Sequence, residues 1–152
     1  MTKASLAFLL AQLGSHAAAR FADRLSPLDL MPAHAGTLRL IDSSEGISQQ
    51  ALGAVLGVAP SRLVVLIDEL QQRRLVDRRD HPHDRRSYAL YLTEKGRDVL
   101  KVIGRAARDH EESLCAALSA QERADLASLL ERIARQQGLK PGVHPGFSRM
   151  RP

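Results

Sequence analysis

Residues 75–96 have the sequence LVDRRDHPHDRRSYALYLTEKG, and the interpretation of the chain starts from this stretch. It opens with the apolar pair Leu75-Val76, continues through a polar segment around Pro82 that favours a turn, and ends in alternating apolar residues. Alternation with a period of two is typical of a β-strand. The stretch therefore predicts a β-hairpin with a long, basic tip. Its second strand is expected to carry Tyr88, Leu90 and Leu92 on one face and Ala89 and Tyr91 on the other.

Two short apolar stripes precede the hairpin and predict a pair of helices. Ser48 can cap the first helix, and Pro60 suits the first turn of the second. Gly57, between them, supplies a backbone position that tolerates a tight turn. Two short helices joined around a glycine are typical of a helix-turn-helix. The apolar positions are Ala51, Leu52, Val55 and Leu56 in the first helix and Leu63, Leu66, Ile67 and Leu70 in the second.

Longer helices are expected on both sides of this unit. On the N-terminal side, one apolar stripe ends near the break at Ser26-Pro27, and a second begins at Pro32. On the C-terminal side, Thr93 can cap a long helix whose stripe runs to Leu118.

The last helix is expected to begin with a capping box, because Glu122 follows Ser119 at the required distance of three residues. Its apolar stripe continues until Gly138. Residues 138–152 are rich in proline, glycine and cations, which predicts a flexible tail.

Composition favours a helical protein. The chain has 152 residues, of which 44% are hydrophobic and only 3% aromatic, which favours packing between helices. Together with the predicted hairpin, this gives an expected fold class that is mainly α with a two-stranded β wing. The formal net charge of +5 favours a polyanionic partner. Cys115 is the only cysteine, which excludes an intramolecular disulfide and suits a reducing compartment.

The N-terminal residues include a short apolar stretch after Lys3 that superficially resembles a signal peptide. Gln12, His16 and Arg20 interrupt it, and its apolar residues recur at helical spacing, so an amphipathic helix is the better interpretation. No stretch reaches the roughly 18 apolar residues that a membrane span needs. We therefore expect a cytoplasmic protein without a membrane partner.

The order of these elements resembles the multiple antibiotic resistance regulator (MarR) family over roughly residues 5–137. The most specific similarity is to that family's wing signature, with an Asp-x-Arg element at Asp84 and Arg86. The matching stretches are RDHPHDRR at 79–86 and LYLTEKG at 90–96, and upstream ALGAVLGV at 51–58 and LIDEL at 66–70.

The resemblance implies a homodimeric winged helix-turn-helix regulator that binds double-stranded DNA at a roughly palindromic operator. It further implies a repressor released by a small phenolic or anionic ligand. The chain departs from the family at two places: Val64-Val65 stand where Thr-Arg is common, and Arg74 stands where glycine is common. Arg62, near the start of the helix that enters the major groove, is the expected replacement for the base contact.

The expected DNA contacts come from the starts of the paired helices and from the hairpin. They are Ser48, Gln49, Gln50, Pro60, Ser61, Arg62, Val65, Arg78, Asp84, Arg85 and Arg86. By resemblance, Arg86 enters a minor groove while Asp84 holds the wing tip, although a solvated turn would explain the same charges. Ser48 is equally well explained as an ordinary helix cap.

Residues 1–30 are expected to form the first helix of a dimerisation region, 31–97 the DNA-binding lobe and 98–137 the last helices of the dimerisation region. The expected dimer contacts are Leu6, Leu10, Leu13, Leu118, Leu126, Leu129, Leu130 and Ile133. The stripe on the last helix could equally complete a monomeric core. The resemblance also implies an effector pocket, for which the candidates are His16, Arg20, His34 and Arg39, with structural or surface roles as the alternative.

No catalytic, metal or cofactor site is expected. The sequence lacks a Gly-rich phosphate loop, a nucleophile elbow and a His-x-x-x-His pair, which disfavours an enzyme. His81 and His83 lie in a turn without a further ligand, and Cys115 lacks a neighbouring cation that would activate its thiol. The alternative function is a winged-helix protein-interaction module, which the apolar pair Val64-Val65 favours.

Overall fold

The computed structural model describes residues 3–149; residues 1–2 of the expected first region and 150–152 of the expected tail lie outside the described residues. The described chain is mainly helical with a two-stranded antiparallel sheet, so the predicted fold class is confirmed. The helices are α1 (Leu6–Leu25), α2 (Pro32–Ser43), α3 (Gln49–Leu56), α4 (Pro60–Gln72), α5 (Glu94–Leu114) and α6 (Ala120–Gln136), with the short 3-10 helices η1 (Ser26–Leu28) and η2 (Pro145–Arg149). The strands are β1 (Val76–His81) and β2 (Asp84–Leu92).

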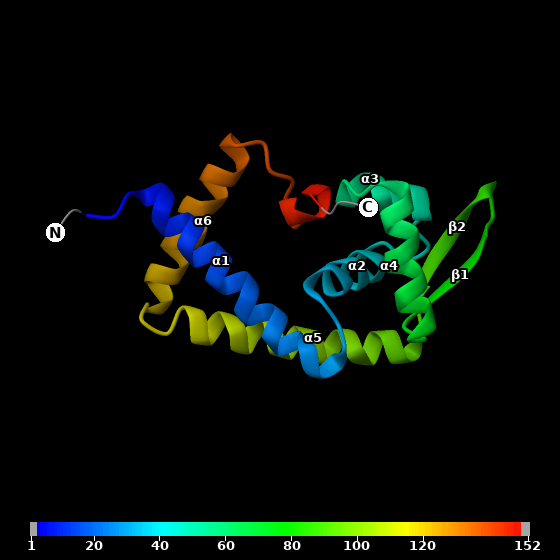
Figure 1. Ribbon diagram of the computed structural model, residues 1–152, viewed down its shortest axis with the longest axis horizontal. Helices are drawn as coiled ribbons and strands as arrows, with labels where there is room; N and C mark the ends of the chain where they lie inside the picture. The colour runs from blue at the N-terminus through cyan, green and yellow to red at the C-terminus, as the bar shows by residue number, and fades with distance from the viewer. Residues whose placement is uncertain (1–2, 150–152) are drawn as a thin grey trace.

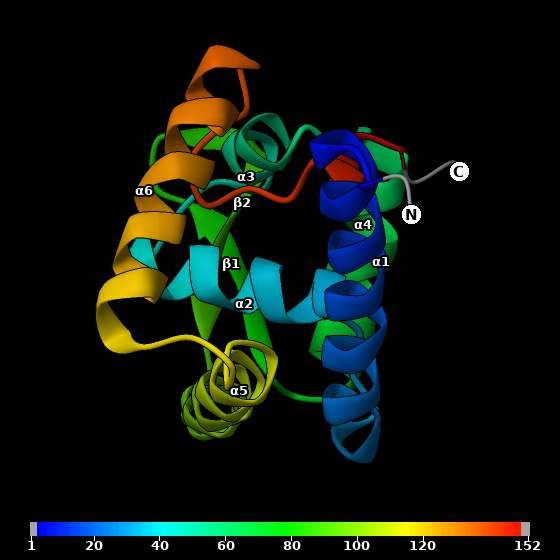
Figure 2. The same ribbon diagram turned by 90° about the vertical axis from the view of Figure 1, so that its left-hand side faces the viewer.

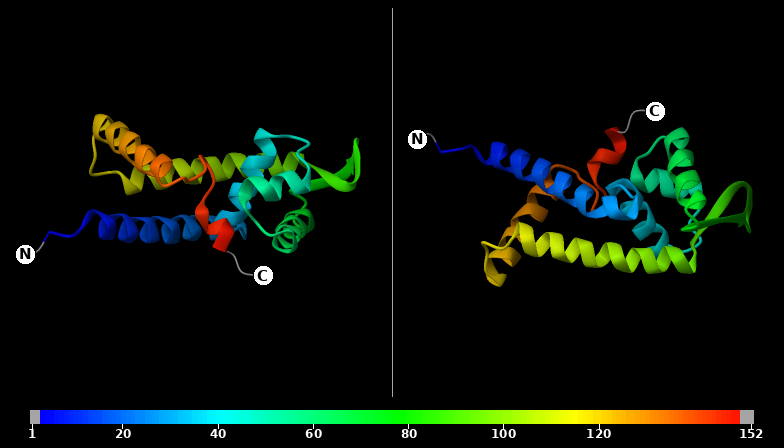
Figure 3. Two further views of the ribbon diagram at one scale, coloured as in Figure 1. Left: turned by 90° about the horizontal axis from the view of Figure 1, so that it is seen from above. Right: turned by 60° about the horizontal axis from the view of Figure 1, so that its bottom comes forward.

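The two ends of the molecule differ in architecture (Figure 1). α6 and the first turns of α1 lie at one end, whereas α3, α4 and the hairpin lie at the other, and α5 extends between them (Figure 1). Figure 2 shows α6 above α5 on one side and α1 on the other, and both views in Figure 3 show the hairpin projecting away from α6. No single helix in the described chain is long and apolar enough to cross a membrane, and α3 with α4 meets that criterion only as a pair bent by 113°.

Helices begin where the sequence offers a cap. Ser48 Oγ accepts a hydrogen bond at 3.0 Å from the backbone N–H three residues on, and Thr93 Oγ1 accepts one at 2.9 Å in the same way. Ser119 and Glu122 form the predicted capping box, in which each backbone N–H donates to the other residue's side chain. Each such cap contributes about 1 kcal/mol. These predicted helix starts are confirmed.

The hairpin is longer, and its turn shorter, than the sequence indicates. β1 and β2 pair along their length with a register shift just before His81, and only Pro82 and His83 lie between the strands. The expected long tip is therefore wrong. The polar residues of both strands form backbone hydrogen bonds with each other while their side chains remain in solvent. A run of polar residues therefore does not mark the end of a strand.

The hairpin is covered only near the body of the protein. Leu90 and Leu92 are buried as expected, but Tyr88, on the same face, is 49% exposed because it lies beyond the core. Ala89, on the opposite face, is buried where it forms an isolated bridge with Ser48. This bridge links β2 directly to the start of α3.

One hydrophobic core holds the paired helices against their neighbours. Its fully buried side chains include Leu25, Leu38, Ile41, Leu52, Leu66, Ile67, Leu70 and Leu90. Burying each side chain of this size contributes about 1.5–3 kcal/mol. One face of α4 is therefore buried in the core, and its opposite face is exposed to solvent.

The chain leaves α4 through a left-handed residue. Arg74 has a φ of 58°, and hydrogen bonds of 2.9 Å run from Arg74 N–H to Gln71 O and from Leu75 N–H to Leu70 O. This is the Schellman arrangement, whose left-handed position favours glycine. A side chain at that position costs about 1–2 kcal/mol, so Arg74 introduces strain where the resemblance leads us to expect glycine.

Gly96 lies where the first turn of α5 crosses the chain after α4. A Cβ at Gly96 would lie 2.1 Å from Leu75 O, a distance that no side chain can adopt. The close approach explains why the segment after the hairpin ends in glycine. It also fixes the start of α5 against the end of α4.

The C-terminal segment, expected to be flexible, packs onto the body as far as Phe147. Phe147 is 7% exposed and belongs to the core. Arg39 Nη2 donates a hydrogen bond to Gly142 O at 2.6 Å, and Lys140 Nζ donates to a backbone oxygen of α3 at 3.3 Å. The expectation is wrong for this part of the tail because composition gave no weight to a single aromatic side chain with a large apolar area.

Candidate nucleic-acid interface

α4 presents the outer face of its N-terminal half. Leu63 is buried, whereas Pro60 and Ser61 are exposed and Val64 and Val65 are 41% and 43% exposed. These outer residues occupy the positions from which a recognition helix reaches base edges. The face offers one hydroxyl and three apolar side chains, which suit contact with thymine methyl groups better than hydrogen bonding.

Arg62 is less accessible than the sequence indicates. Its side chain is half-buried, and its Nε has no hydrogen-bond partner among the described residues. A buried donor without an acceptor costs about 1–3 kcal/mol. A binding partner that places a hydrogen-bond acceptor near Nε would therefore stabilise the Arg62 side chain. Arg62 remains a candidate DNA contact.

Ser48, Gln49 and Gln50 lie together at the start of α3. The Ser48 oxygen is occupied as the helix cap, although its hydroxyl proton is free to be donated. Gln49 Oε1 accepts a hydrogen bond from Arg78 Nε at 3.0 Å. Gln50 is exposed, and its side chain is the most available of the three.

Arg78, on β1, is held between three acceptors. Its Nη1 donates to Asp68 Oδ1 at 2.6 Å and to Gln71 Oε1 at 3.2 Å, and its Nε donates to Gln49. The side chain is 18% exposed. The structure thus joins this hairpin arginine to α3 and α4 and leaves it little solvent contact.

The tip of the hairpin carries the free cations. Arg85 and Arg86 are exposed, and neither guanidinium has a hydrogen bond or ion pair within residues 3–149. Asp84 Oδ1 accepts a hydrogen bond from Arg86 N–H at 2.9 Å, which shapes the backbone of the tip. Arg79 is oriented differently, with its guanidinium 4.2 Å from the centre of the Tyr91 ring. The hairpin arginines therefore do not form a single group.

The turn histidines interact with each other. His83 N–H donates to His81 Nδ1 at 3.2 Å, and their rings lie edge to face at 6.2 Å. In the part of the chain that the structure describes, no group of three or more His, Cys, Asp or Glu side chains is placed to hold a metal ion. Cys115 is half-buried at the C-terminal end of α5.

Known proteins share this arrangement. The MarR family model matches residues 28–87, which contain α2, α3, α4, β1 and the start of β2. A transcriptional regulatory protein for the hcr operon of Thauera aromatica is 34% identical over 110 residues, which cover 72% of this chain and 66% of that protein. The transcriptional repressor CouR, solved bound to a 23-mer DNA duplex, is 33% identical with a TM-score of 0.77 over 86% of this chain and 92% of CouR. This chain belongs to the MarR family.

Solved MarR proteins from E. coli agree with this assignment. Wild-type apo MarR is 26% identical to this chain, with a TM-score of 0.77 over 88% of this chain and 98% of MarR. A cysteine-to-serine MarR mutant complexed with operator DNA is 27% identical, with a TM-score of 0.74 over 84% of this chain and 92% of the mutant. The MarR family comprises transcriptional regulators. The family membership predicted from the wing signature is confirmed.

The four residues expected to form an effector pocket in this MarR-family chain lie in three places. His16 and Arg20 line a cavity of about 410 Å³ between α1 and α5. His34 is buried, and its Nε2 lies 2.6 Å from Glu69 Oε2 of α4. Arg39 is bound to the C-terminal segment. His34 and Arg39 thus have structural partners away from the cavity, so the four residues do not line one pocket.

The cavity between α1 and α5 is lined by basic and polar side chains from both helices. Its lining residues are Leu13, His16, Arg20, His110, Ser113 and Leu114. His110 also stacks on Phe21, with ring centres 5.5 Å apart. Partial burial, followed by the positive charges of Arg24, Arg20 and His16, lowers the pKa of His110. The place of His110 in this cavity does not follow from the sequence, because no local spacing connects a residue of α5 to residues of α1.

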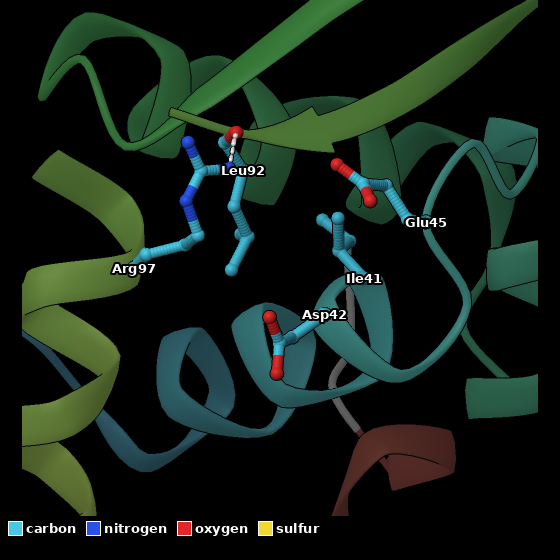
Figure 4. Close-up of a pocket in the computed structure, with 5 residues that line it drawn as sticks. All are labelled: Ile41, Asp42, Glu45, Leu92 and Arg97. Atoms are coloured by element: carbon cyan, nitrogen blue, oxygen red, sulfur yellow. Dashed lines mark hydrogen bonds between the residues drawn. The ribbon is translucent and has the colours of Figure 1, made fainter. Parts of the chain in front are cut away.

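A smaller depression lies between α2, β2 and α5 (Figure 4). It is lined by Ile41, Asp42, Glu45, Leu92 and Arg97 and has a volume of about 50 Å³. Arg97 Nη1 donates a hydrogen bond to Leu92 O at 3.0 Å across one side of it. Small-molecule sites measure about 300–1,000 Å³, so this depression suits water and not an organic ligand.

The residues expected at a dimer interface are exposed on α1 and α6, with one exception. They are Leu6, Leu10, Leu13, Leu126, Leu129, Leu130 and Ile133. Leu118, expected on the stripe of α5, lies in the following turn because α5 ends at Leu114. The expected boundary at residue 97 falls inside α5, so a continuous helix joins the two regions.

Proposed function

We propose that this protein is a homodimeric, sequence-specific DNA-binding repressor that acts in the cytoplasm and catalyses no reaction. One observation carries the proposal: α4, whose outer face is exposed, lies at the same end of the molecule as the hairpin (Figure 1), and the hairpin carries the unpaired Arg85 and Arg86. The similarity to CouR, solved on a DNA duplex at 33% identity, supports the same use of that end here.

Each α4 would enter a major groove with Pro60, Ser61 and Val65 toward the bases. Gln50 at the start of α3 would donate to phosphate. Arg86 would reach into the adjacent minor groove, whose negative potential attracts a guanidinium, while Asp84 holds the tip. The apolar face of α4 makes this protein depend on methyl contacts and on DNA shape more than on a bidentate arginine.

A second copy of the chain would cover the leucine stripes of α1 and α6. No residue of α6 is buried in the single chain, although the helix carries Leu126, Leu129, Leu130 and Ile133. Exposing a row of apolar side chains to water is unfavourable in free energy. An isologous dimer, in which the same surface of two copies packs together, removes this surface from water. The dimer would present two α4 helices to successive major grooves, about 34 Å apart.

The dimer can be tested by size. Sedimentation velocity of the full chain should give the mass of two copies, and Leu129→Arg should give one, because Leu129 is 52% exposed in the single chain. Glu131→Arg introduces the same side chain two positions away and is the matched control. A wild-type chain that sediments as a single copy would contradict the dimer.

The ligand of this repressor would bind in the cavity between α1 and α5. Arg20 supplies positive charge there, the His16 and His110 rings supply hydrogen-bonding nitrogens, and Leu13 and Leu114 supply apolar surface, which suits a small anionic or phenolic molecule. A ligand releases DNA only if it binds more tightly to a dimer whose α4 helices have the wrong spacing.

Duplex binding tests the proposal as a whole. Fluorescence anisotropy with a labelled genomic duplex pool should show affinity that falls steeply as salt rises, because several arginines displace counterions from phosphate. The double variant Arg85→Ala with Arg86→Ala should bind more weakly. A chain with no affinity for duplex DNA at low salt would contradict the proposal and favour a protein-interaction module, to which the exposed Val64 and Val65 would then belong.

A further inference from the structure

Four side chains meet at one point between α3, α4 and the hairpin. Arg78 of β1 binds Asp68 and Gln71 of α4 and Gln49 of α3, and we refer to these four residues as the Arg78 junction. The three acceptors come from two helices: Gln49 belongs to α3, and Asp68 and Gln71 belong to α4. Arg78 therefore bonds to both helices at once, in addition to the backbone bridge between Ser48 and Ala89 that joins β2 to the start of α3.

The geometry of the junction favours a stable connection. Arg78 Nη1 and Asp68 Oδ1 are 2.6 Å apart, within the range of a charge-assisted hydrogen bond, which is stronger than a neutral one. The Arg78 side chain is 18% exposed and that of Asp68 is 46% exposed, so solvent screens the pair only in part. The Tyr88 ring lies 5.7 Å from the Arg78 guanidinium on the hairpin.

At a DNA surface, the negative charge of Asp68 and the positive charge of Arg78 would have opposite effects on binding. Asp68 lies on α4, the helix that enters the major groove under the proposed function, where an unpaired carboxylate would repel phosphate. Pairing with Arg78 neutralises it. The same pairing uses the Arg78 donors inside the protein, and it leaves phosphate binding to Arg85 and Arg86 at the tip.

We propose that Arg78 is a positioning residue that fixes the angle of the hairpin relative to α4, and not a phosphate contact. The effect of this angle on DNA binding rests on the proposed function. Under that function, the angle determines whether the hairpin tip and α4 can bind adjacent grooves at the same time. Asp68, Gln71 and Gln49 then contribute to DNA affinity without touching DNA.

Asp68→Ala gives the sharpest test, because electrostatics and positioning predict opposite results. Removing a negative charge from a DNA-facing helix should tighten binding if the charge alone matters. If the junction positions the hairpin, affinity for a selected duplex should fall about tenfold. Alanine also favours the helix, so the variant is expected to fold. Asp80→Ala removes the same charge from an exposed hairpin position and should bind at least as tightly as the wild type.

A double-mutant cycle separates the two roles of Arg78. For a positioning residue, Asp68→Ala, Arg78→Ala and the double variant should lose affinity to a similar extent, because each breaks the same connection. For a phosphate contact, Arg78→Ala should weaken binding, Asp68→Ala should not, and the effects should add. Either the additive pattern or an undiminished affinity of Asp68→Ala overturns the inference.

Hydrogen exchange tests the junction without DNA. Backbone amides of β1 and β2 should exchange about tenfold faster in Asp68→Ala than in the wild type and in Asp80→Ala, because the hairpin loses its charged hydrogen bond to α4. Unchanged exchange overturns the inference. A wild-type chain that binds no duplex contradicts the proposed function, whereas the exchange result still decides whether Arg78 holds the hairpin.

Discussion

Asp84 Oδ1 accepts a hydrogen bond from the backbone N–H of Arg86 at 2.9 Å, so the residue that shapes the hairpin tip lies two positions from the cation that the tip presents. The bond occupies one carboxylate oxygen and leaves the Arg86 guanidinium in solvent. A short acidic side chain in a turn commonly binds its own backbone in this way. The Asp-x-Arg element thus combines a backbone constraint with a free positive charge.

Arg86→Ala should reduce the salt dependence of duplex affinity. A side chain that neutralises one phosphate contributes about one unit to the slope of log affinity against log salt concentration. Anisotropy titrations at several salt concentrations measure this slope. Arg79→Ala is the matched control, because the Arg79 guanidinium lies over the Tyr91 ring. Equal slope losses in both variants would mean that the tip has no special part in DNA binding.

Arg74→Gly should stabilise the fold by about 1 kcal/mol. Arg74 has a φ of 58°, which costs a side chain more than glycine loses in conformational freedom. Urea unfolding followed by circular dichroism measures the difference. Arg74→Ala keeps a Cβ at the same backbone angle and should give no comparable gain. A less stable glycine variant would show that the Arg74 side chain has a favourable contact that outweighs the strain.

Phe147→Ala should destabilise the protein by about 2 kcal/mol, because a buried aromatic side chain is lost from the core. The same urea experiment measures this change. Leu139→Ala, at a position 45% exposed in the same segment, should have a much smaller effect. If the two variants were equally stable, the docking of the C-terminal segment would be wrong.

His110 should titrate below the ordinary histidine value of 6.5, because partial burial and then Arg24, Arg20 and His16 lower its pKa. The folded protein then binds fewer protons at this site than the unfolded chain, so the stability from neutral His110 is present above pH 6.5 and is lost as the pH falls toward the lowered pKa. An NMR titration of the ring Cε1–H measures the pKa directly.

Arg24→Gln should raise the pKa of His110, because it removes one of the positive charges. Lys101→Gln removes a charge elsewhere on α5 and should leave the titration unchanged. A His110 pKa at or above the ordinary value in the wild type would contradict the arrangement of this cavity.

Local signals predicted the elements of the fold well. Ser48, Thr93 and the Ser119 capping box act within three residues, so their helix starts follow from the sequence. The burial of Leu90 and Leu92 follows from the alternation in β2. The exposure of Tyr88 does not, because alternation does not show how far a hairpin extends beyond the core.

The partners of the site residues could not be predicted, because they come from distant parts of the chain. Arg78 is predicted to contact DNA, but its acceptors Asp68 and Gln49 lie on two separate helices, α4 and α3. His34 is predicted to contact an effector, but its Nε2 lies 2.6 Å from Glu69 Oε2 of α4. Nothing in the local pattern indicates such pairs.

Selection of bound sequences from a random pool of DNA duplexes tests the central claim most directly. Two α4 and hairpin units related by a two-fold axis predict enrichment of an inverted repeat whose half-sites are centred about one helical turn apart. Recovery of no enriched sequence, or of a single site without symmetry, would contradict the account.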